Sequence, residues 1–267
     1  MKLPTTARAL PSLFKVGFAE AVAYRAEFLV WMFSTTMPLI MLALWSAVAR
    51  DAPVGRFGQK EFVAYFLATF IVRQLTGSWV AWEMNFEIRR GTLALRLLRP
   101  IPPMLTFAVQ NLSAQPLRLV VALPMAAIWL WSVGAGQLSR DPVLWVAFGA
   151  AMLGSWLITF LTSFGVGCLA FFMESSVKIM EAWLILFFVF SGYIIPVELF
   201  PPAVKVVVDW LPFRYQIGLP VELMTAAHDR QAALALLGGQ WAWVTVMLGG
   251  AILLWRRGLE RFAAFGG

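Results

Sequence analysis

Long apolar runs without a charged residue constrain the fold of this chain more than any other feature. The longest covers residues 143–173, and a second covers residues 28–49. About 20 apolar residues cross the roughly 30 Å hydrocarbon core of a membrane as a helix, so runs of this length predict transmembrane helices. The composition agrees, because 61% of the 267 residues are hydrophobic and 13% are charged, whereas soluble domains have about half and about a quarter. We therefore expect an integral membrane protein.

The apolar runs predict an all-α polytopic membrane protein with six transmembrane helices in one domain, residues 1–267. A membrane β-barrel would instead show segments of about ten residues that alternate between apolar and polar side chains. The uncharged run at 182–197 would span only about 24 Å as a helix, so its helix is expected to begin near Lys178. The six predicted spans are residues 28–49, 62–82, 119–138, 143–173, 178–197 and 231–255.

The segments that flank these spans predict the orientation. Lys and Arg residues are more frequent in the segments that lie inside when both termini are cytoplasmic, and basic residues favour that side. The same distribution accounts for the net charge of +7, so no nucleic-acid partner is expected. Residues 1–27 place apolar residues at helical spacing among basic ones and lack the apolar core of a cleavable signal. They predict a helix in the cytoplasmic membrane interface, and a plain cytoplasmic tail is the alternative.

Few residues could carry catalysis. The sequence lacks the G-x-x-x-x-G-K-[ST] pattern of ATPases and the H-E-x-x-H and G-x-S-x-G patterns of hydrolases. Cys168 and His228 are each the single residue of their kind, which leaves almost no material for a His/Cys metal site. His228 falls in a polar stretch and is expected to be a solvated loop residue. We therefore expect no catalytic residue, metal or cofactor on this chain.

Arg73 is the one charged residue deep inside a predicted span. Charges within a membrane are costly and tend to be functional. Gln74 is adjacent, and Glu83 lies further along what is predicted to be the same helix. Two interpretations stay open. Arg73 lines a cavity enclosed by protein or binds an anionic group, or it forms a structural ion pair between helices.

The most charged stretch connects the second and third predicted spans, at residues 83–103, EMNFEIRRGTLALRLLRPIPP. Glu83 and Glu87 are four residues apart and share one helix face. Gly91 can end that helix, and the leucines that follow among arginines predict a short amphipathic helix at the cytoplasmic surface. This helix could dock a partner or be a solvated basic loop. The candidate residues are Glu83, Glu87, Arg89, Arg90, Gly91, Leu93, Arg96, Arg99 and Pro100.

The stretch 191–215, SGYIIPVELFPPAVKVVVDWLPFRY, follows the fifth predicted span. Its prolines prevent one continuous helix. Lys205 and Asp209 are four residues apart, as on one helix face, although the alternating valines also fit a strand. An open strand edge is costly in a membrane, so we predict a helix–proline–helix excursion that re-enters the outer leaflet. The candidate residues are Ser191 and Gly192 as a hinge, with Pro196, Pro201, Pro202, Lys205, Asp209, Pro212 and Tyr215.

With these features together, the chain resembles the membrane permease subunits of ABC transporters of the ABC-2, or type V exporter, class. Three features carry this resemblance, and the first is the predicted basic N-terminal helix. The second is the stretch GTLALRLLRP, which is similar to a G-x-L-x-x-x-L-L-R-P pattern of such permeases. The third is SGYIIPVELFP, which is similar to their S-G-x-x-x-P-x-x-x-x-P pattern. The first stretch occurs in the compact bacterial subfamily formerly catalogued as a domain of unknown function. The resemblance covers essentially the whole chain.

The resemblance implies a permease with six spans in a bacterial inner membrane, paired as a homodimer or heterodimer. It implies two separate cytoplasmic ATPase subunits, which would hold the ATP and Mg²⁺. The segment Glu87 to Pro100 would be the coupling helix that docks on the ATPase, and the segment after the fifth span would lie near an outer gate. The alternatives are a stand-alone membrane enzyme or secondary carrier, which would act without ATP, and a scaffold that transports nothing.

Overall fold

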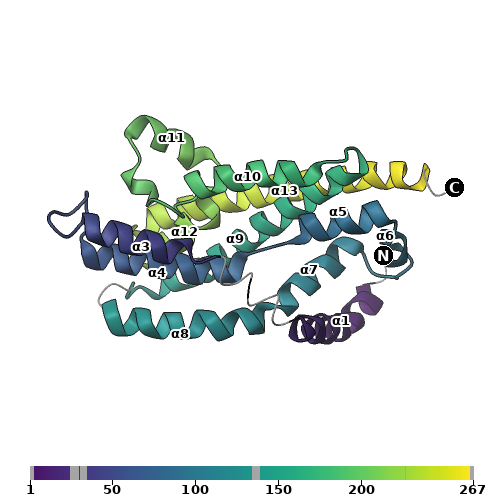
Figure 1. Ribbon diagram of the computed structural model, residues 1–267, viewed down its shortest axis with the longest axis horizontal. Coiled ribbons are helices and arrows are strands. Elements are labelled where there is room, and N and C mark those ends of the chain that lie inside the picture. Colours follow the sequence, from purple (N-terminus) through teal and green to yellow (C-terminus); the bar gives the residue numbers. More distant parts are fainter. Residues whose placement is uncertain (1–2, 25–29, 31–34, 134–138, 226, 265–267) are drawn as a thin grey trace.

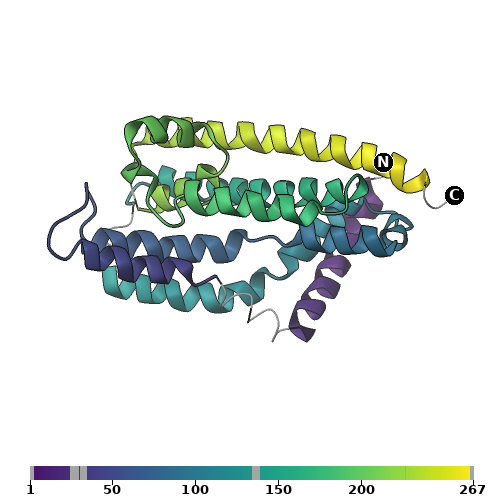
Figure 2. The ribbon, with the colours of Figure 1, turned by 45° about the horizontal axis from the view of Figure 1, so that its top comes forward.

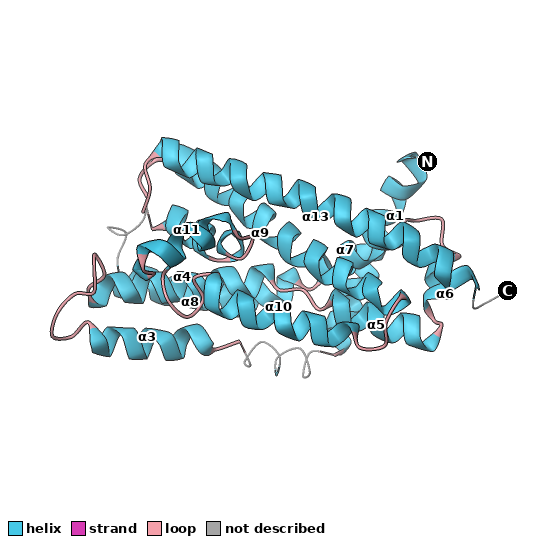
Figure 3. Cartoon of the chain, turned by 90° about the horizontal axis from the view of Figure 1, so that it is seen from above, coloured by secondary structure: helices cyan, strands magenta, loops and turns pink. Residues whose placement is uncertain are grey.

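The computed structural model describes residues 3–24, 30, 35–133, 139–225 and 227–264. Over those residues the regular elements are all helices, and β pairing is limited to one isolated bridge between Val54 and Phe57. Figure 3 shows the same result as cyan helices joined by short loops. The predicted all-α class is therefore confirmed for the described part of the chain.

The longer helices form an elongated bundle along one axis (Figure 1). At its centre, α9 (Pro142–Cys168) packs against α13 (Arg230–Ala264), α5 (Val80–Arg90), α10 (Ser176–Phe190) and α4 (Gln59–Thr76). Two further helices, α3 (Met37–Val48) and α8 (Gln115–Val133), pack on α4. The helix α1 (Leu3–Ala23) packs on α7 (Pro103–Ser113) and is inclined to the bundle (Figure 2).

The two ends of the bundle differ. The short helix α6 (Leu93–Leu97) lies at the end where the chain also starts and finishes (Figures 1 and 2). The helix α11 (Pro202–Trp210) and the loop between α3 and α4 lie toward the other end. The predicted coupling and outer segments are thus separated along the length of the molecule.

Three helical stretches among the described residues are long and apolar enough to cross a membrane: Pro103–Trp131, Pro142–Phe171 and Arg230–Phe262. A shorter apolar helix is α3. The total of six spans stays a prediction. Most of residues 28–34, in the first predicted span, lie outside the described residues.

The central helix α9 starts with two strong helix signals. Asp141 accepts a hydrogen bond from the Val143 amide at 2.9 Å, and Pro142 occupies the first turn, where no amide donor is needed. With its 27 residues, α9 is about 40 Å long. Gly154 lets α13 approach closely, because a Cβ on it would lie 2.5 Å from a side-chain oxygen of Gln240.

Several helix boundaries differ from the predicted spans. The expected continuous helix over 62–82 does not form, because α4 ends at Thr76 and α5 begins at Val80. The helix expected at 119–138 already begins at Gln115, and α7 precedes it directly. The helix expected at 178–197 ends at Phe190, two residues before Gly192. Gly192 has a left-handed φ of +89°, which an α-helix cannot contain. The last helix extends past 255 to Ala264.

The break between α4 and α5 is stabilised by two side chains from α8. Carbonyl oxygens at the end of a helix have no partner within it. Here the Gln115 amide donates to the Leu75 carbonyl at 2.8 Å, and Arg118 donates to the Gly77 carbonyl at 2.7 Å. These contacts satisfy backbone groups that a continuous helix would have bonded internally.

Candidate functional site

The predicted coupling segment folds as a tight turn between two helices. Gly91 ends α5 in the left-handed conformation, with a φ of +72°, and its amide donates to the Ile88 carbonyl at 3.2 Å. Glycine is the residue that adopts this conformation without steric cost. The five-residue helix α6 follows, and Pro103 begins α7. The segment therefore reverses the chain at the end of the bundle.

Arg96 is the centre of this turn, and it faces inward. Its residue surface is only 8% exposed. Its guanidinium joins α5 to α7 through a set of short contacts, and it lies over the Phe107 ring at 3.8 Å from the ring centroid. The polar contacts are with Glu87 at 3.0 Å, Glu83 at 3.3 Å, Thr106 at 3.1 Å and Gln110 at 2.6 Å. Arg96 thus fixes the turn rather than presenting its charge to a partner.

The outer side of the turn is formed by different residues. Leu95 and Leu98 are 65% and 82% exposed, and Arg99 beside them is exposed as well. We call these three residues the turn surface. Leu93, in contrast, is completely buried. Leu95 and Leu98 were absent from the predicted site, although two leucines three apart in a basic segment are the signal that could have identified them.

The other predicted residues of this segment lie along its edge. Arg89 is exposed and donates to the carbonyl of Met173, and Arg90 stacks on the Phe86 ring at 4.0 Å. Gly91 and Pro100 are exposed. The structure thus brings these residues to one end of the bundle and divides them into an outward set and an inward set.

The predicted hinge after α10 is tightly packed. Ser191 is buried, and its carbonyl accepts a hydrogen bond from the Gly218 amide at 2.8 Å. The Tyr65 hydroxyl donates to the Gly192 carbonyl at 2.8 Å. A Cβ on Gly192 would lie 2.5 Å from that hydroxyl, so glycine is required both for the φ and for the space.

Residues 197–210 fold as two short helices separated by prolines. A 3-10 turn at Val197–Leu199 follows Pro196, and α11 starts at Pro202 after the extended Pro201. The helical alternative for this stretch is therefore the one that forms. Lys205 pairs with Asp209 at 2.7 Å across one turn.

The exposed face of α11 is apolar. Its large exposed apolar side chains are Val204, Val206, Val207 and Trp210, and Trp210 is 78% exposed. Val208 faces the opposite way and is buried. The helix ends at Trp210, and the extended Leu211 follows it just before Pro212. An exposed apolar face suits contact with lipid, and the depth of α11 in a membrane stays a prediction.

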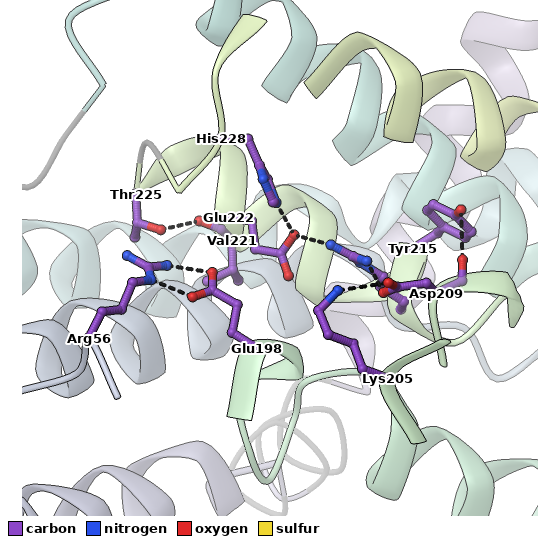
Figure 4. A network of polar contacts seen from close by, with 10 residues as sticks. Arg56, Glu198, Lys205, Asp209, Tyr215, Val221, Glu222, Thr225 and His228 are labelled. Carbon is purple, nitrogen blue, oxygen red and sulfur yellow. Dashed lines mark hydrogen bonds and ion pairs between the residues drawn. The ribbon is translucent and has the colours of Figure 1, made fainter. Parts of the chain in front are cut away.

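A buried ionic network anchors this outer segment (Figure 4). Arg214 donates to Glu222 at 2.9 Å, and both side chains are almost completely buried. Arg214 also pairs with Asp209, and the Tyr215 hydroxyl donates to the Asp209 carbonyl at 3.1 Å. We call Asp209, Arg214, Glu222 and His228 the outer network. It links α11 to α12 (Gly218–Met224).

Two members of the outer network were not predicted. Arg214 and Glu222 stand in an otherwise apolar stretch, and that isolation is the signal that could have identified them. His228 also differs from expectation, because its ring nitrogen lies 2.7 Å from Glu222 in a partly buried position. Burial alone would raise the pKa of Glu222, but the hydrogen bond with His228 and the charge of Arg214 lower it to about 2.

Arg73 lies in the last turn of α4, beside the helix break. Its guanidinium lies 5.3 Å from the centroid of the Phe187 ring. Glu83 is on the other side of the break, in α5, and contacts Arg96 instead. No ion pair involves Arg73 among the described residues. Arg73 lines a pocket there, and its binding of an anionic group stays a prediction.

The comparisons with known proteins add one finding. A family model described as "ABC-2 family transporter protein" matches residues 27–266, which is nearly the whole chain. No curated protein matches the sequence. The matched range includes both the turn surface and the outer network.

Proposed function

Because the chain belongs to the ABC-2 family of transporter proteins, we propose that it is the permease subunit of an ATP-driven exporter. It is a multi-pass membrane protein, as its family and its long apolar helices show. In this proposal it has no ATPase activity of its own, and a separate cytoplasmic subunit binds the ATP and Mg²⁺. The family match is the observation that carries the proposal. A second permease subunit, identical or different, completes the pathway.

The turn surface is the proposed docking site for the ATPase. It exposes two leucines next to an arginine at one end of the bundle, and exposed apolar groups rimmed by charge are typical of protein contacts. The buried Arg96 contacts join this surface rigidly to α5 and α7. A push on the turn would therefore move both helices together, and with them the break between α4 and α5.

The outer segment 191–215 is the proposed gate at the opposite end. It lies away from α6 along the bundle (Figure 1), so both termini and the turn surface would be cytoplasmic and α11 would lie in the outer leaflet of a bacterial inner membrane. The outer network ties α11 to α12, which contacts α9 and α4. Movement of α4 and α9 would thus be transmitted to α11.

Co-purification tests this proposal directly. The chain is expressed with a candidate cytoplasmic ABC ATPase, and Leu98→Glu is compared with Ala52→Glu, which places the same charge at an exposed position in the loop between α3 and α4. We expect Leu98→Glu to lose the ATPase while Ala52→Glu retains it. Equal retention by both variants would exclude the turn surface as the docking site. Transport by the chain without an ATPase would instead indicate a secondary carrier.

A further inference from the structure

A pocket of about 720 Å³ lies beside the turn between α5 and α6, at the end of the bundle that carries the turn surface (Figure 1). Its lining comes from the end of α5 with α6, from the segment that follows α9, and from the last turns of α13. In that segment a short 3-10 helix, η2 (Leu169–Phe171), contacts both α5 and α13. The lining includes no residue of the turn surface or of the outer network.

The floor of the pocket is aromatic. The buried Phe171 ring packs edge-on against Phe262 and Trp255, with 5.8 and 5.9 Å between ring centroids. A Cβ on Gly258 would lie 2.2 Å from this ring, so glycine lets α13 approach it. The candidate span Pro142–Phe171 ends here, and the uncharged part of α13 ends at Trp255. The pocket therefore lies where the hydrocarbon core of a membrane gives way to the lipid head groups.

The rim of the pocket carries more positive than negative charge. Arg89 and Arg90 line it, and the Arg261 guanidinium lies 4.8 Å from the ring centroid of Phe172, which also lines it. Among the described residues none of these three arginines forms an ion pair. Glu174 contributes a carboxylate to the lining. Three arginines thus surround a pocket to which Glu174 brings one negative charge.

Uncharged groups hold the arginines in place. Arg89 donates to the Met173 carbonyl, and Arg90 stacks on the Phe86 ring at 4.0 Å from its centroid. Such contacts orient a guanidinium without neutralising it. The remaining N–H groups stay available to an anionic acceptor, and phosphate oxygens can bind arginine through two hydrogen bonds at once.

Two other carboxylates at this end do not offset the charge of the rim. Glu87 is bonded to Arg96 at 3.0 Å on the inner side of the turn. Glu260 belongs to α13, but it is two residues from Gly258, which faces Phe171. Successive residues of a helix are about 100° apart, so Glu260 lies on nearly the opposite side of α13 from the pocket. A ligand with an acidic group therefore fits the pocket better than a cation.

We propose that this pocket binds the head group of an anionic phospholipid, with its phosphate at Arg89, Arg90 and Arg261 and the start of its acyl chains on Phe171 and Phe262. Basic pockets between membrane helices are known sites for such head groups. The aromatic floor at the edge of the hydrocarbon core favours a lipid over a soluble anion. Bound there, the lipid would join α5 to α13 beside the turn surface. The binding requires only this chain and does not depend on the proposed transport function.

Native mass spectrometry of the purified full chain tests the binding, with no ATPase or ATP present. The chain in detergent is offered phosphatidylglycerol and phosphatidylcholine of the same acyl length in equal amounts. We expect phosphatidylglycerol to be retained about tenfold more strongly, because one hydrogen bond between charged groups corresponds to about this factor. Arg261→Gln should bring the retention of the two lipids close to equality.

Two further variants separate this site from a general attraction to basic residues. Arg256→Gln removes an exposed arginine of the same helix. Arg256 lies two residues before Gly258, on nearly the opposite side of α13 from the pocket, so this variant should retain the preference. Ala94→Phe keeps every arginine but fills part of the pocket that Ala94 lines, and it should weaken the retention of phosphatidylglycerol. Melting temperatures near that of the wild type show that the variants fold.

Four results would overturn the proposal. The first is equal retention of the two lipids by the wild type, and the second is the same loss in Arg256→Gln as in Arg261→Gln. The third is displacement of the lipid by inorganic phosphate at equal concentration, which would indicate a site for a soluble anion. The fourth is unchanged lipid retention in Arg261→Gln together with loss of ATPase co-purification, which would assign the pocket to the ATPase. A tenfold preference combined with failure of any ATPase to co-purify would support the lipid site and reject the exporter.

Discussion

Replacing Glu222 with glutamine should open the outer segment far more than any surface change nearby. The Arg214–Glu222 pair is 2.9 Å long, and its side chains are 3% and 2% exposed. Removing one partner of a buried pair costs about 3–5 kcal/mol, because the other charge stays buried. Asp209 still contacts Arg214 and is 32% exposed, so we expect the lower end of that range. About 3 kcal/mol corresponds to roughly a 150-fold change in the opening equilibrium.

Hydrogen exchange of the amides in α12 measures this opening, since it reports the free energy of local unfolding. Glu222→Gln should therefore speed exchange in residues 218–224 by roughly 150-fold in the same detergent. Lys205→Gln is the matched control, because the Lys205–Asp209 pair is about one-third exposed on both sides. Exposed pairs contribute about 0.5 kcal/mol, or roughly a twofold change.

A double variant examines the physical reason. Arg214→Met with Glu222→Leu removes both charges and keeps similar side-chain volumes, so exchange should return toward the wild-type rate. Exchange in Glu222→Gln that stays within a factor of three of Lys205→Gln would refute the buried ionic anchor. A double variant that is worse than the single variant would show that packing, and not charge, holds α12.

Three more predictions follow from particular contacts. The contacts of Glu222 lower its pKa from the ordinary 4.5 to about 2. The ionised Glu222 therefore stabilises the fold fully above pH 4.5, and this stabilisation is lost as the pH falls toward 2. Melting temperatures measured against pH should show the loss in the wild type and not in Glu222→Gln. Gly167→Val should lower the free energy of unfolding by about 1–3 kcal/mol, because a Cβ at this position would lie 2.8 Å from the Met84 side chain of α5. Gly149→Val is the control in the same thermal assay and should have little effect, because a Cβ there would have no atom within 4 Å. A membrane-impermeant maleimide should label Ala52→Cys, in the exposed loop between α3 and α4, in intact cells and Leu98→Cys only after permeabilisation; the reverse pattern would invert the proposed orientation.

The sequence alone was sufficient for the fold class but not for the helix break. Long uncharged runs leave helices as the structure that satisfies backbone groups in lipid. The residues Thr76–Gly77–Ser78 carry no comparable signal, because membrane helices tolerate isolated glycines. The break is held by Gln115 and Arg118 from another part of the chain. Tertiary contacts of this kind cannot be read from local pattern.

The candidate residues show the same limit. Their segment was identified from charge and proline spacing, but burial decided their roles. Arg96 was expected at a docking surface and is instead enclosed, because Glu83 and Glu87 project from one face of α5 toward it. The pair Arg214–Glu222 forms because a 3-10 turn and α12 bring residues eight apart into contact. Neither pairing follows from a helical repeat.

Labelling of Leu98→Cys tests the central claim most directly, since it asks whether an ATPase covers the turn surface. The native Cys168 is buried, so the introduced thiol is the accessible one among the described residues. We predict that adding the ATPase to the detergent-purified chain slows maleimide labelling of Leu98→Cys at least about tenfold, as burial of a contact residue requires. Labelling of Ala52→Cys, in the loop between α3 and α4 at the other end, should be unchanged. Equal labelling of Leu98→Cys with and without bound ATPase would contradict the account.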